Sequence, residues 1–455
     1  MSIIIPANSA VGGGYDVDNS LRFEWADAGN LNKTLGTATN RKKFTISTWV
    51  KRSDLYTNGA SRSNYVIAAG TSANTNVDEL YFRFDTIDFS AYESSSTKFQ
   101  LRSDALFRDV AAWYHLVIAF DSTQGTSSNR IKIYVNNVQI TDWDIETYPS
   151  QNLEPLFNKN VQHMIGRVLD GAKYYGGYMS EFVFIDGQQL DPTSFGEFDE
   201  DSGTWKPISV SGLTFGNNGF YLEFKDSSAL GADTSGNSNN FTVVNIAAND
   251  QMPDTCTNNW CTINSLNAVN STNLAEGNLQ YSAPGGGVAQ YVGTMGMSTG
   301  SWYYEFRPRS GTVDYQIGIA EAPATPPGGN DYQRWTYKNN GRLEFVGSST
   351  AGWGSTYTNG DVIGISMDVD NGTFKAYKNG TLSGTKTGLD TDITWLPHFV
   401  GYGGPTVDVN FGQDSTFAGA TTAGGNTDAD GYGNFKYAVP TDHYALNTKN
   451  LAEYG

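Results

Sequence analysis

The sequence contains few cysteines, histidines and basic residues, and each shortage argues against a class of function. Two cysteines among 455 residues are too few for a disulfide framework. No two of the four histidines stand four residues apart, which excludes the helix of a zinc protease. The 29 Lys and Arg residues are outnumbered by 47 Asp and Glu residues. Because neutralising phosphates requires clustered cations, we expect no nucleic-acid partner.

Long apolar runs and helical periodicity are also missing. No run approaches the roughly 18 apolar residues of a membrane span, so we expect no membrane insertion. Residues 1–6 (MSIIIP) contain no basic stretch and no long apolar core, which predicts no secretory signal. The sequence shows no sustained i, i+3, i+4, i+7 apolar stripe, no heptads and no short β-helix repeat. Neither a helical domain nor a long fibrous shaft is therefore expected.

Short strand patterns are abundant instead. Residues 44–50 and 131–135 alternate apolar and polar side chains, as half-buried strands do. Asn136 and Asn137, which follow the second of these segments, form a typical hairpin turn pair. Further candidate strands lie at residues 80–84, 115–120 and 182–185. Many short strands separated by Gly, Asn and Asp predict an all-β fold built from β-sandwiches.

Shifts in composition divide the chain into five parts. Residues 197–275 are rich in Asn, Ser and Gly and contain few long strand patterns, which is typical of a connector with small β elements. The predicted parts are an N-terminal arm at 1–16, a β-sandwich at 17–196, the connector at 197–275, a second β-sandwich at 276–415 and a C-terminal tail at 416–455.

The first sandwich contains a recognisable series of segments. They are residues 44–49 (FTISTW), 113–121 (WYHLVIAFD), 131–138 (IKIYVNNV) and 177–182 (GYMSEF). In this order they resemble the laminin-G-like, concanavalin-A-like jelly-roll family, and the resemblance implies a lectin-like jelly roll over residues 17–196. Members of that family often bind calcium, but no ligand set is identified here. We predict no cofactor, with calcium left as an open alternative.

The second sandwich resembles a SPRY domain. The segments that carry this resemblance are residues 301–306 (SWYYEF), 317–320 (IGIA), 360–370 (GDVIGISMDVD) and 377–380 (YKNG). The resemblance implies that loops hold the ligand. The aromatic residues in or beside these loops are Trp335, Tyr337, Trp353 and Tyr357. Exposed rings there would stack on sugars or anchor a protein partner, and the alternative is that they fill the core.

The order of modules is a further resemblance. The laminin-G-like block, residues 257–262 (TNNWCT), the SPRY-like block and the tail follow one another as in tail and virion-surface proteins of bacteriophages, including those of marine cyanobacteria. This implies a virion structural protein on the virion surface after assembly in the host cytoplasm. We expect a short tail fibre or receptor-binding appendage that contacts host surface glycan or protein. A capsid (head) decoration protein is the alternative, and a polysaccharide-degrading enzyme is a remote one.

The N-terminal arm is a candidate assembly site. Ile3, Ile4 and Ile5 have strong β-propensity and are followed by Pro6, which ends strand pairing. Residues 12–14 are three glycines that separate this apolar segment from the first sandwich. Because exposing three isoleucines to water is costly, we expect the arm to contact other virion proteins or a second copy of the chain. The symmetry of phage appendages makes a homo-oligomer, a trimer first, the expected assembly.

No catalytic residues are assigned, and we expect no enzyme. Glu197, Asp199 and Asp201 alternate along the chain like the carboxylates of jelly-roll glycoside hydrolases. They lie beyond the last recognisable strand of the first sandwich, however, and Asp201 stands where those enzymes use Glu. We therefore interpret these three carboxylates as part of a solvated acidic connector.

Other polar features are weaker still. Residues 426–431 (NTDADG) have the oxygen spacing that begins a calcium loop, but Tyr437 occupies the position of its bidentate Glu. A polar turn is therefore expected, with no metal site. Cys256 and Cys261 are close enough in sequence to bridge, although cytosolic assembly favours free thiols. His115 lies between aromatic residues in a predicted strand, which is typical of a core or edge residue.

Overall fold

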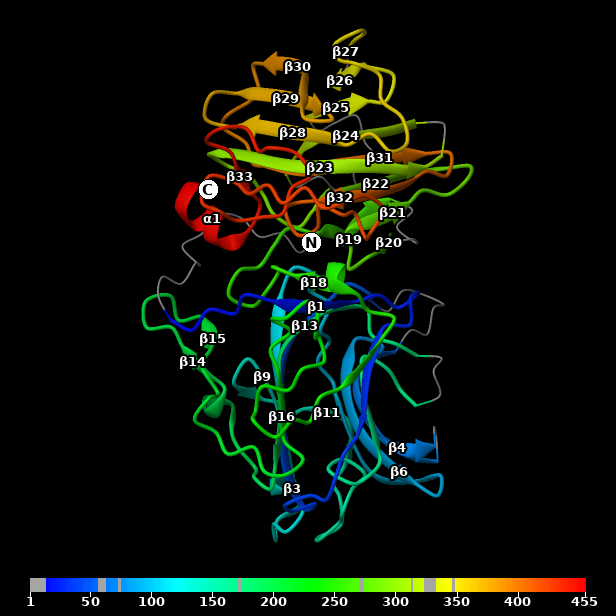
Figure 1. Ribbon diagram of the computed structural model, residues 1–455, viewed down its shortest axis with the longest axis vertical. Helices are drawn as coiled ribbons and strands as arrows, with labels where there is room; N and C mark the ends of the chain where they lie inside the picture. The colour runs from blue at the N-terminus through cyan, green and yellow to red at the C-terminus, as the bar shows by residue number, and fades with distance from the viewer. Residues whose placement is uncertain are drawn as a thin grey trace. The chain divides into compact units, whose positions relative to one another are not determined.

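The computed structural model describes residues 14–55, 63–72, 75–169, 173–269, 274–311, 314–322, 333–345 and 348–455. These residues form two compact domains, the first at residues 14–257 and the second at residues 258–455. Strands account for 46% of the residues and helices for 4% (Figure 1), which confirms the all-β class. Ile3, Ile4, Ile5 and Pro6 lie outside the described residues. Within those residues, no helix is long and apolar enough to cross a membrane.

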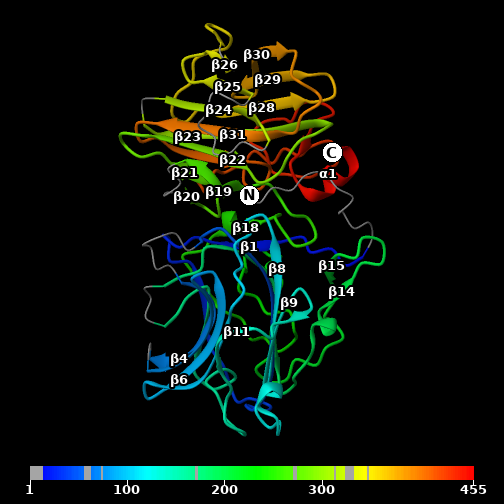
Figure 2. The same ribbon diagram turned by 180° about the vertical axis from the view of Figure 1, so that it is seen from behind.

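The first domain is a sandwich of two antiparallel layers, seen in Figures 1 and 2. In order, the β3 sheet contains β10 (Val138–Gln139), β9 (Ile131–Val135), β8 (Trp113–Asp121), β3 (Lys43–Arg52), β13 (Gly177–Asp186), β1 (Ser20–Phe23) and β18 (Gln251–Met252), with β16 (Phe220–Leu222) also paired to β13. The β5 sheet contains β11 (Trp143–Thr147), β7 (Ser96–Ser103), β6 (Thr86–Glu93), β5 (Asn76–Arg83), β4 (Asn64–Ser72), β12 (Gln162–Ile165), β2 (Asn30–Thr34) and β17 (Thr242–Val244).

Alternation along the strands decides which side chains enter the core between these two sheets. On β3, Phe44, Ile46 and Val50 belong to that core, whereas Trp49 belongs to a second apolar cluster on the other face of the sheet. The predicted hairpin after β9 is present, with Asn136 and Asn137 at φ angles of 49° and 67°. Positive φ at both central residues is what a type I′ turn requires.

The segment expected to be a connector is instead divided between the domains. Residues up to 257 belong to the first domain and residues from 258 onward to the second. Their short strands complete existing sheets, because β16 pairs with β13, β17 with β2 and β18 with β1. The hairpin of β14 (Gly196–Phe198) and β15 (Trp205–Pro207) stands at the start of this segment, and the 3₁₀ turn η3 (Ala248–Asp250) lies within it. The 3₁₀ turns η1 (Ser127–Asn129) and η2 (Pro192–Ser194) lie earlier in the chain. Strands this short have too few residues for a visible period, so the sequence indicated small β elements here but not the sheets that they join.

The outer face of the β3 sheet is covered by this segment, and His115 lies in the covered layer. Its ring stacks on Trp49, with centroids 4.7 Å apart. The indole Nε1 of Trp205 donates to His115 Nδ1 at 3.0 Å, and His115 Nε2 lies 2.8 Å from Ser47 Oγ. Because an indole N–H can only donate, Nδ1 must accept, and Nε2–H then donates to the serine. His115 is thus a neutral core residue, as its sequence context predicted.

The second domain is also a two-sheet sandwich (Figure 2). In order, the β24 sheet contains β19 (Ile263–Val269), β22 (Val288–Gly293), β31 (Trp395–Tyr402), β24 (Asp314–Glu321), β25 (Arg334–Lys338), β26 (Leu343–Phe345) and β27 (Ser348–Thr350). The β23 sheet contains β20 (Leu274–Ala275), β21 (Gln280–Ser282), β32 (Thr406–Asn410), β23 (Ser301–Ser310), β28 (Ile363–Asp368), β29 (Thr373–Lys378) and β30 (Thr381–Thr387), with β33 (Tyr444–Ala445) paired to β23 in parallel.

The residues expected to be a separate tail pack against this sandwich. On β23, Trp302, Tyr304 and Phe306 enter the core between the sheets, and Tyr303 on the opposite face packs with Phe435 from the tail. The helix α1 (Thr448–Tyr454) adds Leu451 to the domain core. The tail therefore belongs to the fold of the second domain.

A buried carboxylate fastens the tail to β23. Glu305 accepts backbone hydrogen bonds from Lys436 at 2.9 Å and from Tyr437 at 3.0 Å. Asn410 Nδ2 donates to the same group at 3.1 Å. Burial raises the pKa of Glu305 to about 7, although these donors favour its charged form.

The environment of His115 predicts a pH dependence of stability. Burial lowers the pKa of His115 from 6.5 to about 3. Between these values the unfolded chain binds a proton that the folded chain does not, so this contribution to stability is complete above pH 6.5 and is lost as the pH falls. We expect the difference in unfolding free energy between wild type and His115→Gln to shrink by about 1 kcal/mol per pH unit between pH 6 and pH 4.

Urea unfolding at a series of pH values measures this difference. Ser47→Ala is the matched control, because it removes the hydrogen bond to the ring but retains the imidazole. Its offset from wild type should stay nearly constant over the same range. A constant offset for His115→Gln as well would contradict the assignment of a buried neutral ring.

Candidate functional site

The structure brings the four aromatic residues expected at the second domain's ligand site into one cluster. Trp335 and Tyr337 lie on β25, while Trp353 and Tyr357 lie between β27 and β28. The ring centroid of Tyr337 is 5.3 Å from that of Trp353 and 5.0 Å from that of Tyr357. Trp353 also stacks on Phe374 of β29, with centroids 5.9 Å apart. The cluster lies between the two sheets at the end of the domain that contains β26, β27, β29 and β30 (Figure 1).

Three of these four rings are buried, and this corrects the expectation that they contact a ligand. Trp335 is 7% exposed, Tyr337 0% and Tyr357 1%. The Tyr357 hydroxyl donates inward, to the carbonyls of Tyr337 at 2.8 Å and Tyr315 at 3.1 Å. A ring enclosed in this way has no free face for a sugar or a protein side chain. The competing interpretation, that such rings fill the sandwich core, holds for these three.

Trp353 is the outermost ring and is only half-buried. Its indole N–H donates to the Thr385 carbonyl at 3.0 Å, which fixes the ring against β30. The ring lies over Gly384, where an added Cβ would stand 2.8 Å from its atoms. Any larger residue at position 384 would therefore displace the indole. The expectation of a binding role stays a prediction for this residue.

Neighbouring side chains extend the surface around Trp353, and the sequence did not reveal them. Leu382 on β30 is 54% exposed but is paired with Tyr377, so it lies on the opposite face of the sheet from Trp353 and is no part of this surface. The Lys386 ammonium, also on β30, lies 5.4 Å from the ring centroid of Phe345 and 5.8 Å from that of Trp335. We name Phe345, Trp353 and Lys386 the edge surface. Their proximity depends on which strands pair and on how the two sheets face each other, and neither can be read from one sequence.

The edge surface combines aromatic rings with a cation. Half-exposed indoles stack on the apolar faces of sugars and also anchor protein interfaces. A lysine held against aromatic rings contributes a cation whose position is restricted. This arrangement can bind a ligand.

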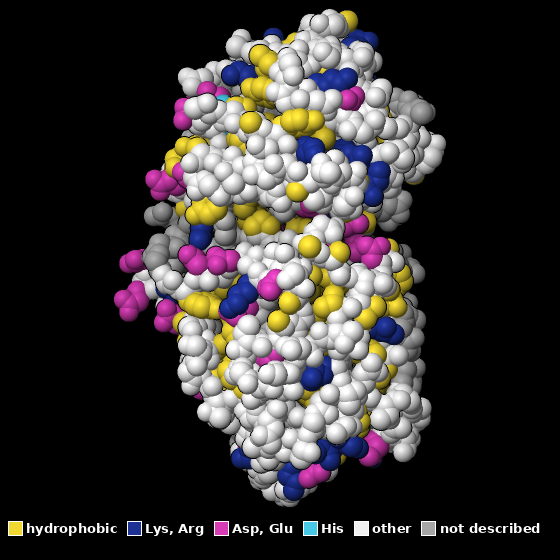
Figure 3. Space-filling view, viewed as in Figure 1, with side chains coloured by type: hydrophobic (Ala, Val, Ile, Leu, Met, Phe, Trp, Pro, Cys, Tyr) yellow, Lys and Arg dark blue, Asp and Glu magenta, His cyan; other side chains and the backbone are white. Residues whose placement is uncertain are grey.

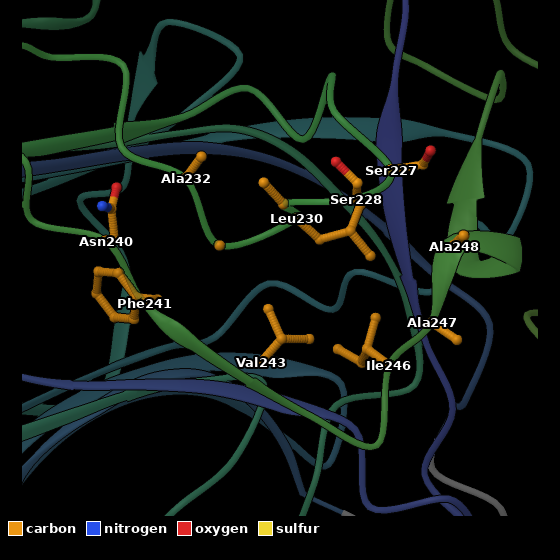
Figure 4. A pocket seen from close by; sticks show the side chains of 12 residues that line it. Ser227, Ser228, Leu230, Ala232, Asn240, Phe241, Val243, Ile246, Ala247 and Ala248 are labelled. Carbon is orange, nitrogen blue, oxygen red and sulfur yellow. The ribbon is translucent and has the colours of Figure 1, made fainter.

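An apolar pocket of about 330 Å³ lies in the first domain, within the segment first expected to be a connector. Figure 4 shows Leu230, Val243 and Ile246 directed toward its interior. Asn240 and the two serines Ser227 and Ser228 supply polar groups around it. No charged side chain lines the pocket. Such a lining suits an apolar group better than a sugar.

The carboxylates that superficially resemble a hydrolase motif are used for local structure. Asp199 accepts hydrogen bonds from Ser202 N at 2.9 Å and pairs with Lys206 Nζ at 3.0 Å. Hydrogen bonds from Ser202 and Lys206 lower the pKa of Asp199 to about 2. Glu197, on the β14–β15 hairpin, pairs with the same lysine at 3.5 Å. These groups close a turn and form ion pairs with Lys206.

The candidate calcium loop is a polar turn. Asp428 Oδ1 accepts from the backbone nitrogens of Asp430 and Tyr432, at 3.0 and 2.8 Å. Its Oδ2 accepts from Ala445 N at 2.9 Å and Asn450 Nδ2 at 2.8 Å. Protein donors therefore occupy both oxygens. Among the residues that the structure describes, no group of three or more His, Cys, Asp and Glu side chains could hold a metal ion.

The difference in burial between Trp335 and Trp353 predicts different costs of truncation. We expect Trp335→Ala to lower the unfolding free energy by about 3–5 kcal/mol, because it opens a cavity in the core. Trp353→Ala should cost clearly less, and Leu382→Ala less than about 0.5 kcal/mol. Urea denaturation measures all three. Equal losses for the two tryptophans would mean that Trp353 is a core residue too.

Two family models match the chain. Residues 14–190 match the concanavalin A-like lectin/glucanases superfamily, in its Laminin_G_3 model, and residues 301–414 match the SPRY domain. Both matches agree with the resemblances found in the sequence. No curated protein matches the chain.

Two SPRY domains are among the solved structures that match this chain. That of human HERC1 is 20% identical, with a TM-score of 0.29, over 32% of this chain and 96% of that one. The TRIM65 PSpry domain is 15% identical, with a TM-score of 0.27, over 33% and 88%. A Bacteroides ovatus protein assigned to carbohydrate binding is 14% identical, with a TM-score of 0.34, over 50% and 58%. The chain thus combines a concanavalin A-like domain with a SPRY domain.

Proposed function

We propose that this chain is a non-enzymatic attachment protein on the surface of a bacteriophage virion, in a short tail fibre or receptor-binding appendage. Its ligand is a host surface glycan or protein. Two domains of lectin-like and SPRY type in one chain support a binding role. The order of modules, which resembles that of phage virion-surface proteins, supports the location.

The observation that carries the binding role is the edge surface. Trp353 is held in one orientation by its hydrogen bond to Thr385 and by its contact with Gly384. A side chain that is already ordered loses little conformational entropy when a ligand binds. Lys386 on β30 is paired with Phe374, on which Trp353 stacks, so an aromatic ring and a charge are offered on the same side of the sheet.

The acidic segment supports a binding protein rather than a hydrolase. A glycosidase needs one carboxyl group as acid and a second as base or nucleophile, on either side of the glycosidic bond. Glu197 and Asp199 share Lys206 as an ion-pair partner, and Asp199 also caps a turn. Neither carboxylate is arranged for proton transfer to a substrate.

Substitution of Trp353 tests the proposed binding surface. We expect Trp353→Ala to weaken adsorption of the labelled protein to marine cyanobacterial cells by at least about tenfold, since buried aromatic anchors contribute most of an interface's binding energy. Lys386→Ala should have a smaller effect that decreases in high salt. Cell-binding isotherms over a panel of strains supply the measurement.

Tyr402→Ala is the matched control, because Tyr402 is an aromatic residue of the same domain with 45% exposure and lies outside the edge surface. Its adsorption should equal that of wild type. Undiminished adsorption of a folded Trp353→Ala protein would reject the edge surface as the binding site.

The N-terminal arm is proposed to attach the chain to the particle. Ile3, Ile4 and Ile5 would pack on another virion protein or on a second copy of this chain, with the glycines at 12–14 as a flexible joint. Deleting residues 1–14 should leave the melting temperature of the purified protein unchanged but abolish incorporation into particles. Immunoblots of purified virions measure incorporation. Normal incorporation of the truncated chain would place the attachment site elsewhere.

A further inference from the structure

A fully buried lysine–aspartate pair joins β3 to the segment that closes the first domain. Lys51 Nζ lies 2.7 Å from Asp254 Oδ2, and the two side chains are 1% and 0% exposed. Lys51 lies on the outer face of the β3 sheet, and Asp254 follows β18 by two residues. The residues are 203 positions apart in the chain. Their contact holds the last part of the domain against one of its central strands.

The surroundings of this pair are aromatic. Trp49, Trp113, Tyr178 and Trp205 form the apolar cluster on this face, together with Met252. The Tyr178 ring centroid is 5.8 Å from Lys51 Nζ. Removing an ammonium and a carboxylate from water costs several kcal/mol for each ion. If the two groups react to form an uncharged product, this desolvation cost is avoided.

A second pair in the same domain shows why the lysine matters. Arg52 and Asp85 are equally buried, at 1% and 0%, with 2.9 Å between Nη2 and Oδ1. A guanidinium stays protonated in proteins and is no nucleophile. A lysine that gives up its proton presents a neutral amine, which attacks carbonyl carbon. Only the lysine pair can therefore react with its partner.

We propose that Lys51 and Asp254 condense to an intramolecular amide, an isopeptide bond between Nζ and Cγ. A proton first moves from Nζ to Oδ2, which leaves a neutral amine beside a neutral carboxylic acid. The Nζ lone pair then attacks Cγ and forms the new C–N bond. A second proton passes from Nζ to the hydroxyl, the C–O bond breaks, and one water leaves. No oxidant, reductant or other reactant is required.

Trp113 is placed to assist this reaction. Its indole N–H donates to Asp254 Oδ1 at 3.1 Å. Negative charge develops on that oxygen when the amine adds to Cγ, and a fixed donor stabilises it, as in an oxyanion hole. The enclosed cluster then keeps water away from the product amide, which opposes its hydrolysis.

Mass spectrometry of the purified full-length protein tests the proposal. The proposal expects a mass about 18 Da below that of the sequence, because one water is lost. Proteolysis should yield a branched peptide that contains Lys51 and Asp254 and resists hydroxylamine. A succinimide at an Asp–Gly site loses the same mass, but hydroxylamine cleaves it.

Two pairs in the same molecule serve as controls. Lys43 and Asp121 stand 3.1 Å apart, but the lysine is 35% exposed, so their peptides should stay separate. Peptides of Arg52 and Asp85 should also stay separate. Lys51→Arg should restore the full mass and lower the melting temperature, while Lys43→Arg should do neither.

A wild-type mass equal to that of the sequence, or a loss of water that maps to other residues, would overturn the proposal and leave a buried ion pair. This result does not depend on any variant, because the wild-type mass decides it even if Lys51→Arg fails to fold. The proposal is also independent of the ligand, so that cell adsorption and cross-linking are tested separately.

Discussion

In each sandwich of this chain, one sheet carries large side chains on both of its faces. The fold depends on covering the face that points away from the other sheet. In the first domain the outer face of the β3 sheet presents Trp49, Trp113 and His115, which no amount of packing between the two sheets can shield. Residues beyond 190 lie over that face and supply Trp205 and Met252. In the second domain the tail covers Tyr303 with Phe435. Burying such rings contributes roughly 1.5–3 kcal/mol each.

Polar groups in the covering segments explain why each segment packs on its sheet in a single position. Glu305 binds two backbone N–H groups of the tail, and His115 is held between an indole and a serine hydroxyl. In the first domain, Lys51 on β3 pairs with Asp254, which follows β18. A buried polar group left without its partner costs about 1–3 kcal/mol, so any other placement of the cover is penalised. Apolar contact drives the covering, and these pairs determine its register.

The same packing leaves the edge surface as one place where an aromatic ring of the second domain reaches solvent. Tyr337 and Tyr357 fill the core. Trp353 lies closer to solvent and contacts Tyr337 on β25 and Thr385 on β30. Its exposure is a consequence of its position at the open edge of the sandwich. A binding role for the ring therefore adds to a structural role, and stability and adsorption must be measured on the same variants. On the face shown in Figure 3, Lys, Arg, Asp and Glu side chains are scattered, as expected of a chain with 17% charged residues.

The sequence by itself determined the features that depend on neighbours along the chain. Alternation over residues 44–50 and the Asn136–Asn137 pair indicated a strand and a hairpin, and both are present because side-chain period and turn chemistry are local. The two family resemblances were recognisable for the same reason. Only the tertiary structure decided which rings are buried, that the supposed connector and tail are parts of the two domains, and that Lys51 meets Asp254. These outcomes depend on strand pairing and on the covering of sheet faces by residues up to about 200 positions away, and such contacts leave no periodic pattern in a single sequence.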